Sequence, residues 1–424
     1  MKPLRSTRTL AQWLAYIEQL HPRTIELGLE RVHAVLDKMA LRRPGYGVIT
    51  VTGTNGKGST VGMLDAILRA AGYRVGCYTS PHLIRYNERI RIAGREISDV
   101  DLCAAFERIE AARGEVPLTY FEFGTVAAFE YFAKVGIEVA VLEVGMGGRL
   151  DAVNAVDADC AVVTAIDVDH TAWLGNTREA IGLEKAGIFR SGRPAVCGDP
   201  EPPRAITETA ARLGAQFLQI NRDFTIEKIA GGWNWRGPQS VRTGLPTPAM
   251  RGDYQLFNAA AALMALDSLR DRFPVSQSNV RDGLLNAVVP GRFQVLPGQP
   301  LRVLDVAHNP QAARALAATL RQQTVPGKSI AVFGVLKDKD IDGVVRALAD
   351  GFDRWYVGTL AAPRGASAEE LVALLREAGV TAPVLSFSDP VTAYDAACRD
   401  ATDVDRIVVF GSFYTVGDIL ARVG

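Results

Sequence analysis

A glycine-rich segment with one lysine is the part of the chain best suited to bind a phosphate. It reads GTNGKGST over residues 53–60, between a β-branched apolar run and a stretch with apolar residues at helical spacing. Such a loop directs backbone N–H groups and a helix N-terminus at one point, and Lys57 can reach the terminal phosphates. Ser59 or Thr60 can supply an oxygen to Mg²⁺ or to a phosphate. We therefore expect a nucleoside triphosphate here; a glycine-rich structural turn is the alternative.

The match to the standard phosphate-loop pattern is incomplete. GxxxxGK[ST] requires glycine at the position of Val51, and Gly58 follows the lysine where the pattern requires Ser or Thr. Dinucleotide binding is less expected, because no complete GxGxxG occurs in the chain.

Possible metal ligands follow three other apolar runs that are typical of strands. Glu143 ends one run, Ser80 follows another, and Asp167-Val168-Asp169-His170 comes after a third. Open α/β sheets bind ligands at the carboxyl ends of their strands, and hard oxygen ligands suit a Mg²⁺ ion that bridges ATP phosphates. The alternatives are an ordinary surface acid, a turn serine and a hydrogen-bonded structural histidine.

Composition excludes several classes of protein. The 424 residues carry 47 Lys+Arg against 47 Asp+Glu, which gives no basis for nucleic-acid binding. The five cysteines are far apart and form no CxxC, which argues against disulfides and structural zinc. No apolar run reaches the roughly 18 residues of a membrane span, and the N-terminus lacks the apolar core of a signal peptide. We expect a cytoplasmic globular protein without nucleic-acid or membrane partners.

The elements that must position these residues alternate between strand and helix. Amphipathic spacing predicts helices such as 59–71 and 177–189. The strands expected in this part are 48–51, 74–79, 139–144, 161–166 and 194–197. Alternation of this kind implies a parallel sheet with helices on both faces. Residues 221–256 break the pattern and are typical of short antiparallel strands and turns.

A Pro- and Gly-rich stretch at 290–300 is the expected hinge, and a second βα series follows it. Strands are expected there at 301–306, 329–335, 354–358, 383–387 and 406–410. The sequence therefore predicts an α/β protein with a phosphate-binding domain at 1–289, a linker at 290–300 and a smaller α/β domain at 301–424.

Taken together, a series of motifs along nearly the whole chain resembles the folylpolyglutamate synthase family of the Mur-ligase superfamily, and most closely its bacterial bifunctional dihydrofolate synthase/folylpolyglutamate synthases. The motifs are TIELGLERV, VTGTNGKGST, YTSPHLIRYNERI, LTYFEFGT, LEVGMGGRLDAVN, DHTAWLGNT, EKAGIFR, PGRFQ, DVAHNP and GSFYTVGD.

The resemblance implies a Mur-ligase-like fold, with a P-loop ATPase domain built on a mostly parallel sheet and a smaller Rossmann-like C-terminal domain of the glutamate ligase type. It implies an ATP-dependent carboxylate–amine ligase that adds L-glutamate to 7,8-dihydropteroate and to reduced folates through an acyl phosphate. ATP and two Mg²⁺ ions are the implied cofactors, and a monomer is expected.

The resemblance also implies roles for individual residues. ATP would be held by Thr54, Asn55, Gly56, Lys57, Gly58 and Ser59, with Asn258, Arg292 and Asp305. Mg²⁺ would be bound by Ser80, Glu143, His170 and Lys185, the last as a carbamate. Lys57, Lys185 and His308 would act in catalysis. The folate precursor would contact Ile25, Glu26, Leu27, Thr119, Tyr120, Phe121, Glu122, Leu150, Asp151 and Ala152.

Two of these residues would be interpreted differently without the family. Lys185 would be a solvated helix charge, and Phe121 would be an aromatic residue of the core. Val153 stands where the family often has threonine, so an apolar side chain replaces a hydroxyl next to the expected pterin site. The alternatives that remain are a Mur-type cell-wall ligase, a P-loop kinase or NTPase, and a nucleotide-binding regulatory module without catalysis.

Overall fold

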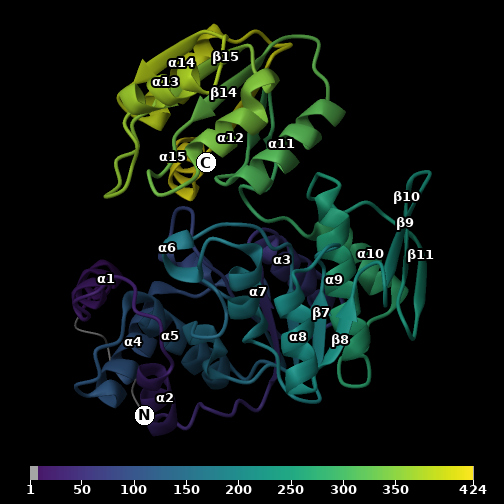
Figure 1. Cartoon of the computed structure of the whole chain (residues 1–424). Coiled ribbons are helices and arrows are strands. Elements are labelled where there is room, and N and C mark those ends of the chain that lie inside the picture. The colour runs from purple at the N-terminus through teal and green to yellow at the C-terminus, as the bar shows by residue number, and fades with distance from the viewer. Residues whose placement is uncertain (1–7, 424) are drawn as a thin grey trace. The chain divides into compact units, whose positions relative to one another are not determined.

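The computed structural model describes residues 8–423 and divides into two compact units. The first unit comprises the chain up to His82, Tyr86–Ala249 and Leu256–Ala287. The second comprises Leu83–Arg85, Met250–Gln255 and the chain from Val288 onward. Two short segments that precede residue 288 thus group with the C-terminal unit, which a linear division of the sequence could not foresee. Figure 1 shows the elements of both units.

The first unit is built on an eight-stranded sheet in the order β4-β3-β2-β5-β1-β6-β7-β8. The strands are β1 Gly47–Thr52, β2 Val75–Tyr78, β3 Ile90–Ile92, β4 Arg95–Glu96, β5 Val139–Glu143, β6 Cys160–Val163, β7 Pro194–Cys197 and β8 Gln216–Gln219. From β2 to β8 all neighbours are parallel, and β3 and β4 add an antiparallel edge. Each parallel pair requires a long crossover, and helices supply it.

Helices cover both faces of this sheet. They are α1 Leu10–Gln19, α2 Glu30–Lys38, α3 Lys57–Ala70, α4 Asp99–Arg113, α5 Tyr120–Val135, α6 Thr171–Leu174, α7 Arg178–Ala186, α8 Arg204–Leu213, α9 Tyr254–Ser268 and α10 Gln277–Asn286, with 3₁₀ turns η1 Tyr86–Arg89 and η2 Ala152–Ala155. Buried side chains of α1, α2, α4, α5, α7 and α8 form one core cluster with alternate strand residues, among them Val48, Tyr78 and Leu142. The helix α3 packs against β1, β2 and β5, and α10 packs against α3.

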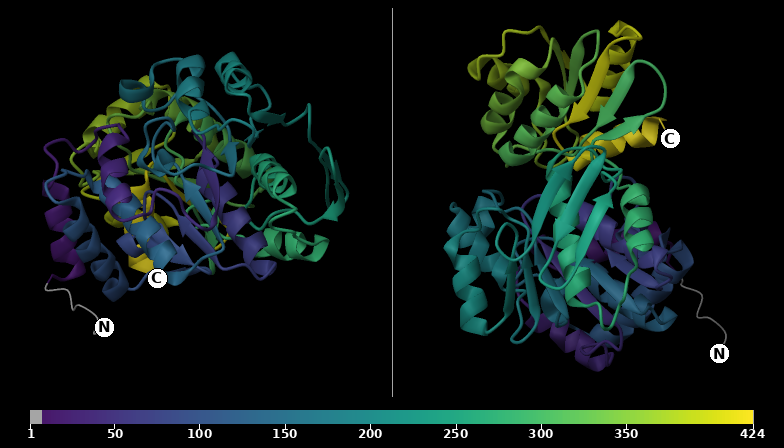
Figure 2. Two further views of the ribbon diagram at one scale, coloured as in Figure 1. Left: turned by 90° about the horizontal axis from the view of Figure 1, so that it is seen from below. Right: turned by 90° about the vertical axis from the view of Figure 1, so that its right-hand side faces the viewer.

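Residues 225–245 form a separate three-stranded antiparallel sheet, as the break in the sequence pattern predicts. Its strands are β9 Thr225–Ile229, β10 Gly232–Arg236 and β11 Val241–Leu245, seen in the right-hand view of Figure 2. Trp233 and Trp235 of the central strand are fully buried, and the Trp233 indole N–H donates to the carbonyl of Pro246 at 2.9 Å.

The second unit has a six-stranded sheet in the order β12-β13-β17-β14-β15-β16. The strands are β12 Gln294–Leu296, β13 Leu301–Leu304, β14 Ser329–Phe333, β15 Arg354–Gly358, β16 Val384–Phe387 and β17 Arg406–Phe410. The helices are α11 Pro310–Gln322, α12 Ile341–Leu348, α13 Ala368–Glu377, α14 Pro390–Asp400 and α15 Phe413–Val423, with the 3₁₀ turn η3 Ala349–Gly351. Only β12 and β13 pair antiparallel among the pairs described, and a hydrophobic cluster lies on each face.

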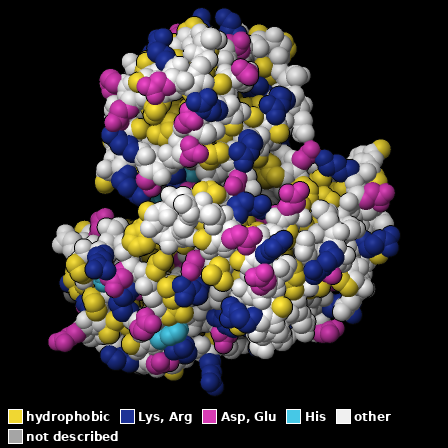
Figure 3. Space-filling view, in the orientation of Figure 1, with side chains coloured by type: hydrophobic (Ala, Val, Ile, Leu, Met, Phe, Trp, Pro, Cys, Tyr) yellow, Lys and Arg dark blue, Asp and Glu magenta, His cyan; other side chains and the backbone are white. Residues whose placement is uncertain are grey.

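The two parallel sheets confirm the predicted α/β fold class. Strand and helix positions agree with the sequence pattern to within a few residues, for example Arg178–Ala186 for the helix expected at 177–189. No helix within residues 8–423 is long and apolar enough to cross a bilayer. On the face drawn in Figure 3, acidic and basic side chains are interspersed on each unit.

Candidate active site

The glycine-rich segment joins β1 to α3 in the first unit. All six residues of β1 are buried, and α3 begins at Lys57 with Gly56 at its N-cap in the left-handed region, at φ 93°. A Cβ atom at Gly53 would collide with the Thr164 hydroxyl, and one at Gly56 would collide with the Asn258 amide oxygen. Both glycines are therefore required by close approach. Asn258, expected from the family to touch the nucleotide, does lie against this loop.

Hydrogen bonds fix the loop to the end of β6. The Thr54 hydroxyl donates to the Asp167 carbonyl at 2.8 Å, and the Thr164 hydroxyl donates to the Asn55 carbonyl at 2.7 Å. The Lys57 ammonium group folds back over the loop and donates to the carbonyls of Gly53 at 3.1 Å and Thr54 at 3.2 Å. A cation on a glycine-rich turn at a helix N-terminus is suited to bind a phosphate.

The expected metal ligands Ser80 and Glu143 lie side by side at this end of the sheet. The order β2-β5-β1-β6 makes the ends of these strands neighbours. The backbone N–H of Ser80 donates to Glu143 Oε2 at 3.2 Å, and Glu143 is 4% exposed. His170, at φ 53°, is the N-cap of α6 and follows the segment that anchors the phosphate loop.

Ser80, Glu143 and His170 offer few protein ligands, which suits a cation that takes most of its ligands from other molecules. Within residues 8–423 no three or more His, Cys, Asp or Glu side chains gather into a ready metal site. A buried carboxylate beside a serine fits Mg²⁺, which takes few protein ligands and completes its shell with water and phosphate oxygens.

Lys185 is not a solvated helix charge, as the plain sequence suggests. It lies on α7 and is 3% exposed. Burial, reinforced by the charge of Lys57, holds the pKa of Lys185 well below its usual value, although Asp169 and Asp151 oppose the shift. This shift favours the neutral, nucleophilic amine, which is the form that reacts with CO₂ to give a carbamate. The influence of Lys57 also shows that Lys185 belongs to the surroundings of the phosphate loop.

Asp151 is a buried carboxylate held by backbone groups. It accepts from Met146 N at 2.9 Å and Val153 N at 3.0 Å, and it is 3% exposed. Burial raises the pKa of Asp151 to about 6, although these two N–H groups oppose the shift. A carboxylate with such a pKa changes its charge close to physiological pH.

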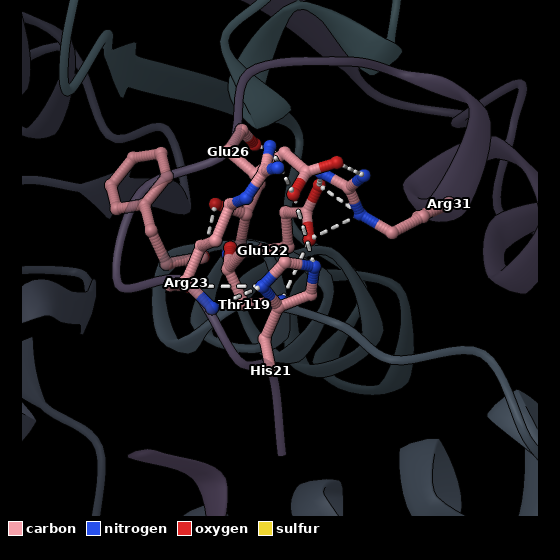
Figure 4. Close-up of polar contacts among 8 residues, drawn as sticks. His21, Arg23, Glu26, Arg31, Thr119 and Glu122 are labelled. Carbon is pink, nitrogen blue, oxygen red and sulfur yellow. Dashed lines mark hydrogen bonds and ion pairs between the residues drawn. The ribbon is translucent and has the colours of Figure 1, made fainter. Parts of the chain in front are cut away.

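Three segments expected to contact a pterin converge in the first unit. The Gly28 N–H donates to the Leu150 carbonyl at 3.2 Å, which joins the first segment to the third. Arg31 joins the first to the second through Glu26 and Glu122 (Figure 4). Phe121 is only partly buried, and a Cβ atom at Gly145 would meet its ring at 2.6 Å. The ring therefore lies over the turn that follows β5 and Glu143.

The remaining expected residues gather in the second unit. Asp305 accepts from Phe293 N and Ala307 N, both at 2.8 Å, and its burial raises the pKa of this carboxyl. The Arg292 guanidinium lies 5.2 Å from the ring centre of Phe413, and the His308 ring lies 6.1 Å from it. His308 Nδ1 is 2.8 Å from the Val306 carbonyl, so Nδ1 carries the proton of the neutral ring and Nε2 is left as an acceptor.

Two family models match the chain. The Mur ligase middle domain matches residues 51–212, and the Mur ligase glutamate ligase domain matches residues 291–413. The dihydrofolate synthase/folylpolyglutamate synthase of Escherichia coli K12 is 45% identical over 411 residues, which cover 97% of this chain and 94% of that protein. The chain belongs to the dihydrofolate synthase/folylpolyglutamate synthase family. The protein of the same name from Haemophilus influenzae is 41% identical, with 99% of each chain covered.

Solved structures of the dihydrofolate synthase/folylpolyglutamate synthase family agree with this assignment. E. coli FolC in complex with DHPP and ADP superposes with a TM-score of 0.94 at 44% identity, covering 99% of each chain. A bifunctional folylpolyglutamate synthase/dihydrofolate synthase with Mn, AMPPNP and L-glutamate bound gives 0.91 at 48% identity, covering 100% of each chain. The predicted family and the predicted Mur-ligase-like fold are confirmed.

Within this member of the family, the structure adds three residues that the sequence analysis did not single out. Thr164 anchors the phosphate loop, Arg31 bridges two expected pterin segments, and Phe413 lies beside Arg292 and His308. Phe413 belongs to the GSFYTVGD motif, so the signal for it was present. Arg31 belongs to the TIELGLERV motif, so a signal was present for it as well, although its partner Glu122 is distant in the sequence. Thr164 lies outside the quoted motifs, and no local pattern marks it.

Proposed function

We propose that this protein is an ATP-dependent carboxylate–amine ligase. It adds L-glutamate to 7,8-dihydropteroate, making dihydrofolate, and extends reduced folates with further glutamates. One observation carries the proposal. The neighbouring ends of β2, β5, β1 and β6 bear Ser80, Glu143, the phosphate loop and the segment before His170, which is the arrangement for a metal-bound nucleotide.

The reaction proceeds in two steps. A carboxylate oxygen of the folate precursor attacks the γ-phosphorus of ATP, and the bond to the departing ADP oxygen breaks. The α-amine of glutamate then attacks the acyl carbon, phosphate leaves, and the amine loses a proton. Negative charge spreads over the transferred phosphoryl oxygens in the first step, and electrostatic stabilisation of that charge is the main requirement of such transfers.

The phosphate loop supplies that stabilisation. Backbone N–H groups of residues 54–59 surround the phosphates, and the Lys57 ammonium group moves from the loop carbonyls to a phosphate oxygen. Ser80, Glu143 and His170 would hold one Mg²⁺, and carbamylated Lys185 a second. These ions, when bound, neutralise phosphate charge. The burial of Lys185 and its lowered pKa support the carbamate.

Residues of both units take part in this function. Residues 1–289 bind ATP and the pterin, 290–300 act as a hinge, and 301–424 form the glutamate ligase domain. Asn258 supports the nucleotide site from α9. Arg292 and Asp305 act on the nucleotide, and His308 acts in catalysis. The protein works as a monomer in the cytoplasm.

Phe121 and Asp151 recognise the folate precursor. A partly buried aromatic ring can stack on a flat heterocycle, and the Asp151 carboxylate can accept hydrogen bonds from pterin N–H groups. Ile25, Glu26, Leu27, Thr119, Tyr120, Glu122, Leu150 and Ala152 complete the surroundings of this ring.

Mass spectrometry of the products tests the proposal. The purified protein is supplied with ATP, Mg²⁺ and L-glutamate, and with either dihydropteroate or tetrahydrofolate. We expect each acceptor to gain glutamate, with one phosphate released per glutamate added. Phosphate release without a glutamate adduct would indicate a kinase or NTPase. Turnover of a UDP-muramoyl substrate instead would indicate a cell-wall ligase, and nucleotide binding without turnover a regulatory module.

A further inference from the structure

Arg31, near the start of α2, is bonded to two acids from different segments. Its Nε lies 3.1 Å from both carboxylate oxygens of Glu122, and Nη2 donates to Glu122 Oε1 at 2.8 Å. Nη1 donates to Glu26 Oε1 at 3.1 Å, and Nη2 to the Glu26 carbonyl at 2.8 Å. Figure 4 shows the guanidinium between the two acids. A planar guanidinium suits this arrangement because its donors are held in a fixed fork.

Glu122 also caps the start of its own helix, α5. It is 3% exposed and accepts from the Thr119 N–H at 2.7 Å, while the Thr119 hydroxyl accepts from the Glu122 N–H at 3.2 Å. This reciprocal pair is a capping box that starts α5. The carboxylate of Glu122 thus fixes the first turn of α5, which carries Tyr120 and Phe121, and also fixes Arg31.

Glu26 belongs to the irregular stretch between α1 and α2. Residues 20–29 lie between these helices, so contacts other than helical hydrogen bonds hold this stretch, among them the Gly28–Leu150 backbone bond and the side-chain contacts of Glu26. Glu26 is contacted by Arg31, by His21 Nε2 at 3.5 Å and by Arg23 Nη1 at 3.5 Å. Of these partners, Arg31 also reaches the first turn of α5.

We propose that Arg31 is a positioning residue for the folate precursor, which holds the stretch of residues 20–28 against the start of α5. The inference rests on the proposed function, because Ile25, Glu26 and Leu27 on one side and Tyr120 and Phe121 on the other are the proposed pterin neighbours. Arg31 touches no reacting group; it acts through the two segments that it joins. The phosphate loop has its own anchors at Thr164 and Asp167, so nucleotide binding is independent of Arg31.

Steady-state kinetics of Arg31→Ala, Arg31→Lys and the control Arg23→Ala test this inference. Arg23 pairs with the same Glu26, but its side chain is 73% exposed. Loss of a charged hydrogen-bonded contact predicts a rise of about 10-fold or more in KM for dihydropteroate with Arg31→Ala. The KM for ATP and kcat should stay within about 2-fold, since a change confined to substrate binding raises KM alone. The KM of Arg31→Lys for dihydropteroate should lie between those of Arg31→Ala and wild type, because an ammonium group lacks the planar set of donors with which a guanidinium binds both acids.

The outcomes separate this inference from the proposed function. If the wild-type enzyme fails to use dihydropteroate, the proposed function is wrong. If the wild type works and the Arg31 variants keep its KM for dihydropteroate, only the positioning role is wrong. Parallel increases in KM for ATP and for dihydropteroate would likewise contradict it, because they indicate general loss of structure.

Trypsin cleavage after Arg23 gives a measurement independent of activity. Arg31→Lys, which keeps the charge beside buried Glu122, serves if Arg31→Ala does not fold. We expect faster cleavage after Arg23 in the Arg31 variant than in wild type. Dihydropteroate should slow the cleavage of that variant. Cleavage at the wild-type rate would show that other contacts hold the stretch, and would overturn the proposal.

Discussion

The amide oxygen of Asn258 occupies the space that a side chain at Gly56 would need. Gly56 is also in the left-handed region, at φ 93°, and is the N-cap of the helix that follows the phosphate loop. Asn258 lies on α9, far along the chain, so the loop receives its shape partly from an element that the local sequence does not contain.

Gly56→Ala is therefore expected to weaken nucleotide binding. The new methyl group forces Asn258 and the loop apart and adds backbone strain, so we expect ATP affinity to fall by about 10-fold or more. The control is Gly72→Ala, at φ 89° with no described heavy atom within 4 Å of its added Cβ. That variant should lose about 1 kcal/mol of stability and keep its ATP affinity. Calorimetric titration with AMPPNP and thermal melting measure the two effects; equal ATP affinities for both variants would contradict the interpretation.

Lys57→Ala is expected to abolish ligation while leaving the fold intact. The ammonium group donates to two carbonyls of its own loop, so its loss costs little stability, whereas transfer of the phosphoryl group loses a positive charge. We expect a fall of about 1,000-fold in kcat, with thermal melting near that of wild type. Lys38→Ala, at the exposed end of α2, is the control and should keep full activity. Near-normal turnover of Lys57→Ala would refute the phosphate-loop assignment.

Lys185→Ala is expected to lose activity and to regain part of it with a small carboxylic acid. Lys185 is buried, so the substitution leaves a cavity that acetate or propionate can enter, and the acid supplies the carboxylate that the carbamate would provide. We expect at least a 100-fold loss of kcat, with partial recovery as acetate is added. The control is Lys134→Ala, whose side chain is 41% exposed and paired with Asp101. Wild-type turnover without acid would exclude a role for Lys185.

Binding of dihydropteroate is expected to weaken as the pH falls through about 6. Burial raises the pKa of Asp151 to about 6, so the carboxylate is charged above that pH and gains a proton below it. The protonated form is a poorer acceptor for pterin N–H groups, and KM for dihydropteroate should rise while KM for ATP stays constant. Asp151→Asn should raise KM at all pH values and remove this pH dependence. If the variant keeps the wild-type pH profile, Asp151 is not the group that titrates.

Much of the fold was predictable because its signals are local. Apolar runs of four to six residues at β1, β5 and β6 and the helical spacing after the phosphate loop mark a parallel α/β sheet without any tertiary information. The expected positions of Ser80 and Glu143 followed from the same logic, since the ends of neighbouring parallel strands meet at one edge.

Lys185 shows where local reasoning fails. Its helix has the charged residues of a solvated surface, and the sequence alone favours exposure. Packing of α7 against α8 and contact of Gly148 with the Glu184 and Lys185 carbonyls enclose that part of the helix. Whether a helix side chain is exposed depends on the elements that pack around the helix, and these elements come from other parts of the chain.

The sequence by itself determined the class of fold and the family, and it predicted the glycine-rich loop between β1 and α3, because each depends on residue types at short, fixed spacing. Only the tertiary structure decided that Asn258 seats the loop, that Lys185 is buried beside the charge of Lys57, and that Arg31 joins Glu26 to Glu122. The physical reason is that these relationships are contacts between segments up to two hundred residues apart, and such contacts exist once the sheet has brought the segments to the same edge.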